Sequence, residues 1–259
     1  HALFSSVGDA VAVPAVAAGN ISFNKTLTGA FNVDVNTAGN TLFNDTVNIA
    51  QLTTDGAGAV QINAASVTTS GTQTYNDALT LLNNTTLTST GAAAAGNISF
   101  NSTIGGAKTL TVNTAGNTLF NGNVNISQLT TDAPGTVQIN AATVATTGTQ
   151  TYNDALTLLS NTTLSSTGAA AAGNITFNNT VDGTKTLAVN TAGNTTFNGR
   201  VGNTAALMSL TTDAAGTTNV NGLSVKTIAA QTFNDDVVLG AHALFSSVGD
   251  AVAVPAVAA

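Results

Sequence analysis

Apolar and polar residues alternate along this chain in short segments that end on a polar residue. In the segment 97–101, Asn-Ile-Ser-Phe-Asn, one polar residue separates Ile98 from Phe100. Both apolar side chains therefore point to one face of an extended strand, while Ser99 points to the other. Similar segments recur along the chain, and none shows the period of an amphipathic helix. The pattern predicts β-strands that are buried on one face.

The strand-like segments recur at intervals of 18 to 23 residues, which predicts a stack of similar rungs. Twelve segments align on a last residue, which is Asn24, Asn44, Asn63, Asn83, Asn101, Asn121, Asn140, Ser160, Asn178, Asn198, Asn221 or Gly240. The residue before each of these is Phe23, Phe43, Ile62, Leu82, Phe100, Phe120, Ile139, Leu159, Phe177, Phe197, Val220 or Leu239. Because all twelve preceding residues are large and apolar, we expect them to form an inward-facing core stack.

The recurrent asparagine has two interpretations. Its side chains can form an amide ladder along the axis, in which one rung donates a hydrogen bond to the next. Alternatively, each residue is held in the left-handed αL conformation that a tight corner needs, which would also suit Gly240. The sequence leaves both interpretations open.

A longer repeat contains these rungs. Three blocks begin at Gly19, Gly96 and Gly173, and the first two blocks are each 77 residues long. Residues 1–18 reappear unchanged as residues 242–259, so the full period is 241 residues. We expect the chain to be a piece of a longer or processed polypeptide.

The repeats predict one continuous domain rather than several. We expect a single β-solenoid over 1–259, divided into 1–18 (the end of a preceding period), 19–95, 96–172 and 173–259. The third block has four extra residues near Asn203 and six more in the segment around Pro255. We expect both insertions to enlarge loops.

A rung of about twenty residues cannot bury its apolar face alone, so successive rungs must stack. We therefore predict an all-β fold, a parallel β-solenoid, with about twelve rungs in each 241-residue period. At the strand spacing of about 4.8 Å, such a stack gives a rod about 58 Å long.

Composition narrows the function. Charged residues make up only 7% of the chain, and the formal net charge is −7. Because no basic stripe can neutralise phosphates, we expect no nucleic-acid partner. The absence of cysteine excludes disulfides and thiolate metal sites within this chain. The apolar runs are far shorter than the roughly 20 residues of a membrane-spanning helix, so we expect no membrane span.

Three recurring runs carry a family resemblance. They are Gly-Asn-Ile-Thr-Phe-Asn at 173–178, Leu-Ala-Val-Asn at 187–190 and Gln-Thr-Tyr-Asn at 150–153. These runs resemble the repeats of large bacterial surface proteins of the filamentous haemagglutinin type, and the resemblance covers almost the whole chain. It implies a right-handed parallel β-helix, export to the cell surface and a fibrous shaft. That family is also known for adhesion, but a shaft repeat transfers no binding residue.

The sequence offers little for catalysis. His1 and His242 occupy the same repeat position, and a triad of Ser246, His242 and Asp250 lacks the nucleophile elbow that would support it. Most aspartates recur at turn positions, where turn chemistry explains them. The glycine- and aspartate-rich nonapeptide of calcium-binding β-rolls does not occur. We expect no enzymatic activity, no catalytic residue, no cofactor and no metal site.

Length is the property that the repeats favour. We expect a structural protein that forms an extracellular or cell-surface filament, with rungs continuing in further periods. Its partners would be further copies of itself, end to end or in the same long chain, and we also expect lateral bundling. The alternative is the shaft of a surface adhesin whose binding function lies in another domain.

Overall fold

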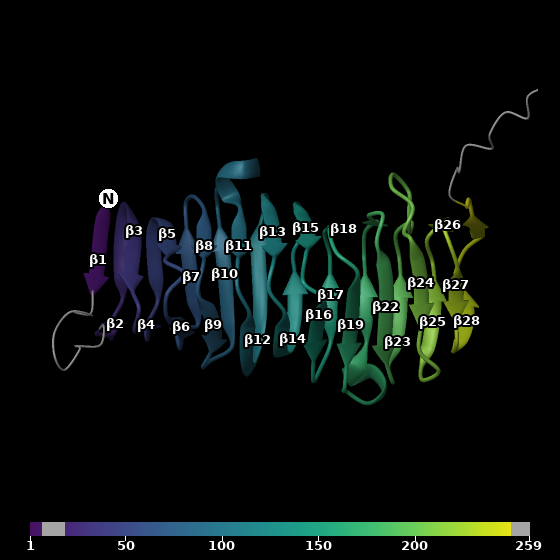
Figure 1. Ribbon diagram of the computed structural model, residues 1–259, viewed down its shortest axis with the longest axis horizontal. Coiled ribbons are helices and arrows are strands. Elements are labelled where there is room, and N and C mark those ends of the chain that lie inside the picture. Colours follow the sequence, from purple (N-terminus) through teal and green to yellow (C-terminus); the bar gives the residue numbers. More distant parts are fainter. Residues whose placement is uncertain (7–18, 250–259) are drawn as a thin grey trace, which may run out of the picture.

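The computed structural model of the 259-residue chain describes residues 1–6 and 19–249. Strands make up 58% of the chain and stack in parallel along one axis to form a rod (Figure 1). Two short 3₁₀ turns interrupt them, η1 (Ala93–Gly96) and η2 (Ala170–Gly173). The predicted all-β parallel solenoid is confirmed, with about eleven turns.

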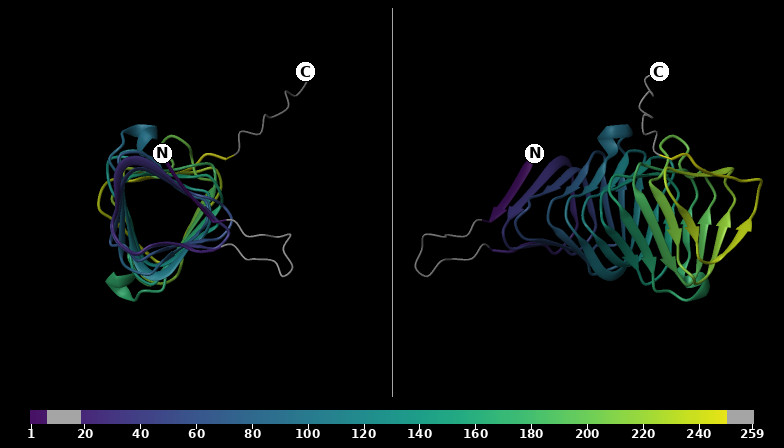
Figure 2. Two further views of the ribbon diagram at one scale, coloured as in Figure 1. Left: turned by 90° about the vertical axis from the view of Figure 1, so that its left-hand side faces the viewer. Right: turned by 45° about the vertical axis from the view of Figure 1, so that its right-hand side comes forward.

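The solenoid has a triangular cross-section (Figure 2). Its three faces are named A, B and C here, in the order in which the chain follows them from Ile21. Each face is a parallel sheet of strands from successive turns. Four longer strands cover two faces: β3 (Leu27–Thr37) and β5 (Val47–Thr54) pass from B to C, while β12 (Ile104–Thr114) and β14 (Val124–Thr131) pass from A to B.

The remaining strands each belong to one face. On face A are β2 (Ile21–Phe23), β4 (Asn40–Phe43), β6 (Ala59–Ile62), β9 (Ala78–Leu81), β16 (Thr143–Thr146), β19 (Thr162–Ser166), β22 (Thr186–Thr191), β24 (Ser209–Thr212) and β27 (Gln231–Phe233). On face B are β7 (Ser66–Thr69), β10 (Thr85–Ser89), β17 (Gln150–Tyr152), β20 (Ile175–Phe177), β23 (Asn194–Phe197), β25 (Thr217–Val220) and β28 (Asp236–Leu239). On face C are β1 (Ala2–Ser6), β8 (Gln73–Tyr75), β11 (Ile98–Phe100), β13 (Asn117–Phe120), β15 (Thr136–Ile139), β18 (Ala155–Leu158), β21 (Val181–Asp182), β26 (Ser224–Thr227) and β29 (Leu244–Ser247).

The alternation in the sequence determines which side chains face inward. In β11, Ile98 and Phe100 are buried while Ser99 is partly exposed. Ile98 lies opposite Gln73 in the turn before and Thr118 in the turn after. Since every turn repeats this arrangement, stacks of Phe, Ile, Leu and Val fill the interior as one continuous core.

The predicted alignment of rungs is wrong where two blocks meet. Phe100 lies opposite Tyr75 and not opposite the segment that contains Leu82. Leu82 is 42% exposed, whereas its neighbour Leu81 is buried. Leu159, predicted in the core, is likewise 40% exposed, and Leu158 is buried in its place.

A longer turn causes the error. Asn76 and Asn101 occupy the same corner in successive turns although they are 25 residues apart. The extra residues include η1, which projects from the rod in Figure 2. The interval of 18 residues between Asn83 and Asn101 therefore does not correspond to one turn. The same holds in the next block, where the longer turn contains η2.

The number of turns changes accordingly. On face C, eleven successive pairings connect Ala2 in β1 to Phe245 in β29. The 241-residue period thus makes about eleven turns instead of the predicted twelve.

The other predicted core positions depend on their place along the rod. Those in the interior are fully buried, namely Phe43, Ile62, Phe100, Phe120, Ile139, Phe177, Phe197 and Val220. Phe23, in the first complete turn, is partly buried. Leu239, in the last turn, is in the expected register but is 53% exposed, because no further turn of the described chain covers it.

The three sequence blocks are rotated relative to one another around the axis. Three turns lead from Ile21 to Leu79 on face A, and the chain then crosses face B before it reaches Ile98 on face C. Ile98 repeats Ile21 in sequence, and the third copy, Ile175, lies on face B. Each 77-residue block therefore makes three and two-thirds turns, and three blocks restore the original face.

The insertion predicted near Asn203 is a loop. Isolated bridges keep Val201 and Leu207 in the sheet, and the residues between them form bends outside it. Thr204 and Ala205 donate backbone hydrogen bonds to the Asp182 carboxylate at 2.8 and 3.0 Å. The second predicted insertion, around Pro255, lies outside the described residues.

Candidate functional site

Asparagine side chains form hydrogen-bonded ladders on the corners of the rod. Asn121 Nδ2 donates to Asn101 Oδ1 at 2.8 Å, and Asn140 Nδ2 donates to Asn121 Oδ1 at 3.2 Å. Among the described residues other than glycine, only Ala93 and Ala170 have positive φ. The ladder interpretation is therefore correct and the αL interpretation is not. The ladder side chains are largely exposed, so the ladders reinforce the outside of the rod.

Each block contributes its own ladder on a different corner. The first joins Asn63 to Asn44 at 2.7 Å after face A. The second runs after face C through Asn76, Asn101, Asn121, Asn140 and Ser160, and the third runs after face B through Asn153, Asn178, Asn198 and Asn221. A ladder thus ends on one corner where another begins on the next.

Two predicted ladder residues differ from this pattern, and two members were missed. Asn83 donates to the backbone oxygen of Asn63 at 3.2 Å instead of to a ladder amide. Asn24 lies one turn before Asn44, because Phe23 pairs with Phe43. Asn76 and Asn153 head the second and third ladders. Their signal in the sequence is the run Gln-Thr-Tyr-Asn-Asp, which occurs at 73–77 and again at 150–154.

Aromatic rings stack beneath the start of each ladder. Phe100 lies between Tyr75 and Phe120, with ring centroids 5.5 and 5.2 Å apart and nearly parallel planes. Tyr152, Phe177 and Phe197 repeat this arrangement at 5.4 and 5.0 Å. Such stacks add to the burial of apolar area, since offset aromatic pairs are attractive by about 0.5–1.5 kcal/mol.

A buried glutamine holds each of these tyrosines. The Tyr75 hydroxyl donates to Gln73 Oε1 at 2.9 Å, and Gln73 Nε2 donates to the carbonyl oxygens of Val67 and Thr88. These two carbonyls belong to successive turns, so the amide connects them inside the core. Burial also raises the pKa of Tyr75, which therefore remains a neutral hydroxyl donor.

Two buried aspartates are poorly compensated. Asp77 is 3% exposed, and its Oδ1 atom has no hydrogen-bond partner. Burial raises the pKa of Asp77 to about 6, nearby Asp55 adds to the shift and the Thr54 hydroxyl opposes it. Asp154 repeats this environment, with a pKa raised by burial to about 6. The predicted explanation by turn chemistry is therefore incomplete for these two carboxyl groups.

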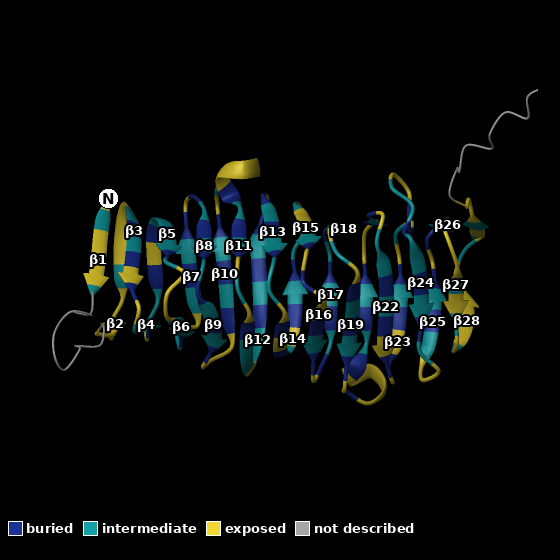
Figure 3. Ribbon diagram, viewed as in Figure 1, coloured by how far each residue is buried: buried dark blue, intermediate teal, exposed yellow. Residues whose placement is uncertain are grey.

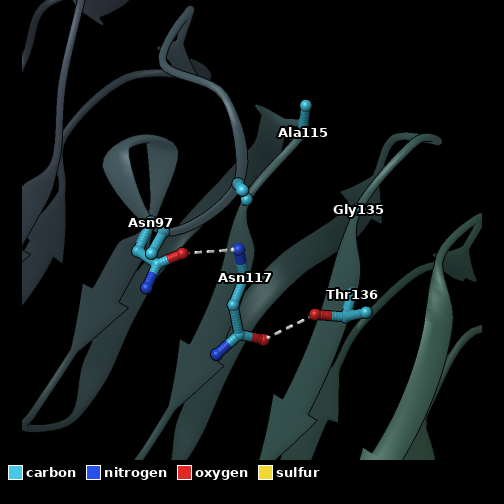
Figure 4. A pocket seen from close by; sticks show the side chains of 8 residues that line it. Asn97, Ala115, Asn117, Gly135 and Thr136 are labelled. Atoms are coloured by element: carbon cyan, nitrogen blue, oxygen red, sulfur yellow. Dashed lines mark hydrogen bonds between the residues drawn. The ribbon is translucent and has the colours of Figure 1, made fainter.

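The largest hollow on the surface lies beside η1 (Figure 4). It has a volume of about 500 Å³ and is lined by alanine, glycine, asparagine and threonine. Asn117 Nδ2 donates to Gln138 Oε1, and Asn117 Oδ1 accepts a hydrogen bond from Thr136 Oγ1 at 3.1 Å. Because this amide is already bonded to its neighbours and no lining residue is charged, the hollow has no group suited to catalysis.

The candidate catalytic residues are not brought together as a triad. Ser246 lies on β29 and His242 lies just before it, whereas Asp250 is outside the described residues. His1 Nε2 is 2.7 Å from Asp34 Oδ2. In residues 1–6 and 19–249, no group of three His, Cys, Asp or Glu side chains is placed to hold a metal ion.

Membrane-spanning helices were also sought. Among the described residues, no helix has the length and apolar character needed to cross a bilayer.

The exposed large apolar side chains lie mainly at the two ends of the rod (Figure 3). Leu3 and Phe4 are exposed at one end, and Val237, Leu239 and Phe245 at the other. The internal counterparts of the last three, Leu79, Leu81 and Leu87, are at most 2% exposed. The ends of the rod therefore resemble internal turns that lack a neighbour.

Comparisons with known proteins give no further guidance, because no family model, curated protein or solved structure matches the chain.

Proposed function

We propose that the protein is structural and forms the shaft of an extracellular filament from stacked solenoid periods. One observation carries this proposal: the 241-residue repeat makes about eleven turns and returns to the face where it began. The identical segments 1–6 and 242–247 both lie on face C. Successive periods can therefore stack with their faces aligned, without a change in the cross-section.

The energetics of the rod agree with a load-carrying shaft. Parallel backbone pairing, aromatic stacks and asparagine ladders all act along the axis. Each links one turn to the next, so stability grows with the number of turns, as in other solenoids. Nothing in this arrangement depends on a single irreplaceable site.

The extracellular location and the adhesin alternative have a different basis. The resemblance to repeats of the filamentous haemagglutinin type supports both, and the lack of cysteine is compatible with export. In the adhesin alternative this chain is the shaft, and another domain binds the target.

Electron microscopy of the purified chain tests the filament. We expect unbranched fibres of uniform width that are much longer than one period. Discrete particles at all concentrations and salt conditions would contradict the proposal, because an open solenoid with apolar ends would then be stable without end-to-end contacts.

A further inference from the structure

The same sequence forms the outermost strand of face C at both ends of the rod. Strand β1 pairs with β3, from Ala2 opposite Val33 to Ser6 opposite Thr37. Strand β29 repeats the β1 sequence and pairs with β26. In the described part of the chain, each of these two strands has a partner along one edge only, on opposite edges. An open edge of this kind is a template for pairing with another chain.

Internal strands show how both edges are used when turns continue. Strands β10 and β19 are the counterparts of β29 in the first two blocks. In β10, Leu87 lies opposite Val67 on one side and Val112 on the other. In β19, Leu164 lies between Val144 and Val189 in the same way.

The two ends of the rod together supply the same set of partners. Phe245 lies opposite Val225, and Phe4, its counterpart in β1, lies opposite Val35. Val225 repeats Val67 in sequence, and Val35 repeats Val112. One copy of the strand, placed between β26 of one chain and β3 of another, would therefore reproduce an internal junction.

The side chains of the last and first turns also match the internal junctions. Tyr75 stacks on Phe100, and the equivalent pair across two chains is Phe233 on Phe23. Leu79 pairs with Ile104, and the equivalent pair is Val237 on Leu27. Leu27 lines an apolar hollow of about 220 Å³ at the start of the rod. Val237 and Leu239, which are exposed at the other end, are suited to fill it.

We propose that a second copy of the chain joins end to end by strand replacement. Strand β29 of one copy displaces β1 from β3 of the next, which places Phe245 opposite Val35. Strands β27 and β28 of the first copy then stack on β2 and β3 of the second. His242 takes the place of His1 beside Asp34. This proposal rests on the filament proposed above and specifies its joint.

The energetics favour such an exchange. Replacing β1 by an identical strand conserves the hydrogen bonds and contacts made with β3. The additional stabilisation comes from the apolar side chains of β27 and β28 and from those of the first turn, which become buried. Before assembly, β1 covers part of the edge that the next copy will use.

A disulfide that locks β1 in place tests the exchange. Ser5 and Asn36 are exposed, lie opposite each other on β1 and β3, and the natural chain has no cysteine. Neighbouring strands are about 4.8 Å apart, within the range that a disulfide bridges. In the double variant Ser5→Cys/Asn36→Cys we expect loss of fibre formation when oxidised and recovery when reduced. The control Ser5→Ala/Asn36→Ala should form fibres in both conditions.

A second variant marks the joint directly. With Ser246→Cys and Asn36→Cys, we expect oxidised fibres to yield covalent multimers on a non-reducing gel, since Ser246 takes the position of Ser5. Fibre formation by the oxidised lock variant, or fibres of the second variant without cross-links, would overturn strand replacement but leave the filament standing. Failure of the natural chain to form fibres would overturn both proposals.

Discussion

The Phe100 ring stacks on the Tyr75 ring at a centroid distance of 5.5 Å, although 25 positions separate the two residues in the sequence. Leu82 is much closer to Phe100 in the sequence but lies on the outside of the rod. This relationship determines where each block joins the next. It also moves each ladder to a new corner, because the longer turn ends on another face.

Substitution of the stacked ring tests this junction. We expect Phe100→Ala to lower the free energy of unfolding by about 3–5 kcal/mol, because it leaves a cavity between two rings. Leu82→Ala is the matched control and should change it by about 0.5 kcal/mol or less, as at other surface positions. Urea unfolding followed by circular dichroism measures both. Equal losses for the two variants would mean that Leu82, and not Tyr75, lies in the core stack.

The ladders make a smaller contribution. Asn121 accepts one ladder hydrogen bond and donates another, so Asn121→Ala removes two. At about 0.5–1.5 kcal/mol for each, we expect a loss of about 1–2 kcal/mol in the free energy of unfolding. Asn125→Ala, at an exposed outward position of β14, serves as the control. If both variants were equally stable in urea, the ladder would contribute nothing.

Glycine at the bend of β12 is required by a close backbone contact. Gly106 has φ +112°, and a Cβ atom there would clash with the Leu81 carbonyl oxygen. We expect Gly106→Ala to destabilise the chain by about 2 kcal/mol or more. The adjacent Gly105 has open space around it, so Gly105→Ala should be neutral or slightly stabilising. Thermal unfolding of the two variants provides the comparison, and a similar melting temperature for both would contradict the close contact.

The buried aspartates predict that the rod is more stable in acid. A carboxyl group whose pKa is raised in the folded state favours the protonated form, so its contribution is largest below the unfolded pKa of about 3.9. That contribution is lost as the pH rises through about 6, the pKa of Asp77 and Asp154 in the fold. We therefore expect a lower melting temperature at pH 8 than at pH 5.

The variant Asp77→Asn should reduce this dependence. It keeps the shape of the side chain but removes the buried charge. Allowing for partial hydration of the carboxylate, we expect a gain of about 1–2 kcal/mol in the free energy of unfolding at pH 8 and little gain at pH 4. Asp236→Asn, at an exposed position of β28, is the control. An equal effect of Asp77→Asn at both pH values would show that its charge is not the cause.

The alternation of apolar residues was sufficient to predict the strands, the parallel stacking and most of the core. It worked because a strand has a side-chain period of two and each rung must bury its inner face on a neighbour. The register at block junctions could not be obtained in the same way. Leu81 and Leu82 are both leucine, so composition does not reveal which faces inward. The alignment assumed turns of equal length, and η1 breaks that assumption.

The ladders illustrate the same limit. The sequence showed that asparagine recurs, but Asn76 was missed because its partner is 25 residues away. The buried Gln73 is a polar residue at an inward position, which a search for apolar residues does not select. Its repetition before Tyr75 and Tyr152 was the available signal. The unpartnered Asp77 carboxylate depends on three-dimensional burial and has no counterpart in the sequence pattern.

The axial repeat of the fibres tests the central claim most directly. If each 241-residue period makes eleven turns and stacks end to end, cryo-electron microscopy should show a repeat of about 53 Å, which is eleven strand spacings of about 4.8 Å. A repeat of about 58 Å would indicate twelve turns and contradict the register derived from Tyr75 and Phe100. Fibres without the strand spacing along their axis would contradict the stacked solenoid itself.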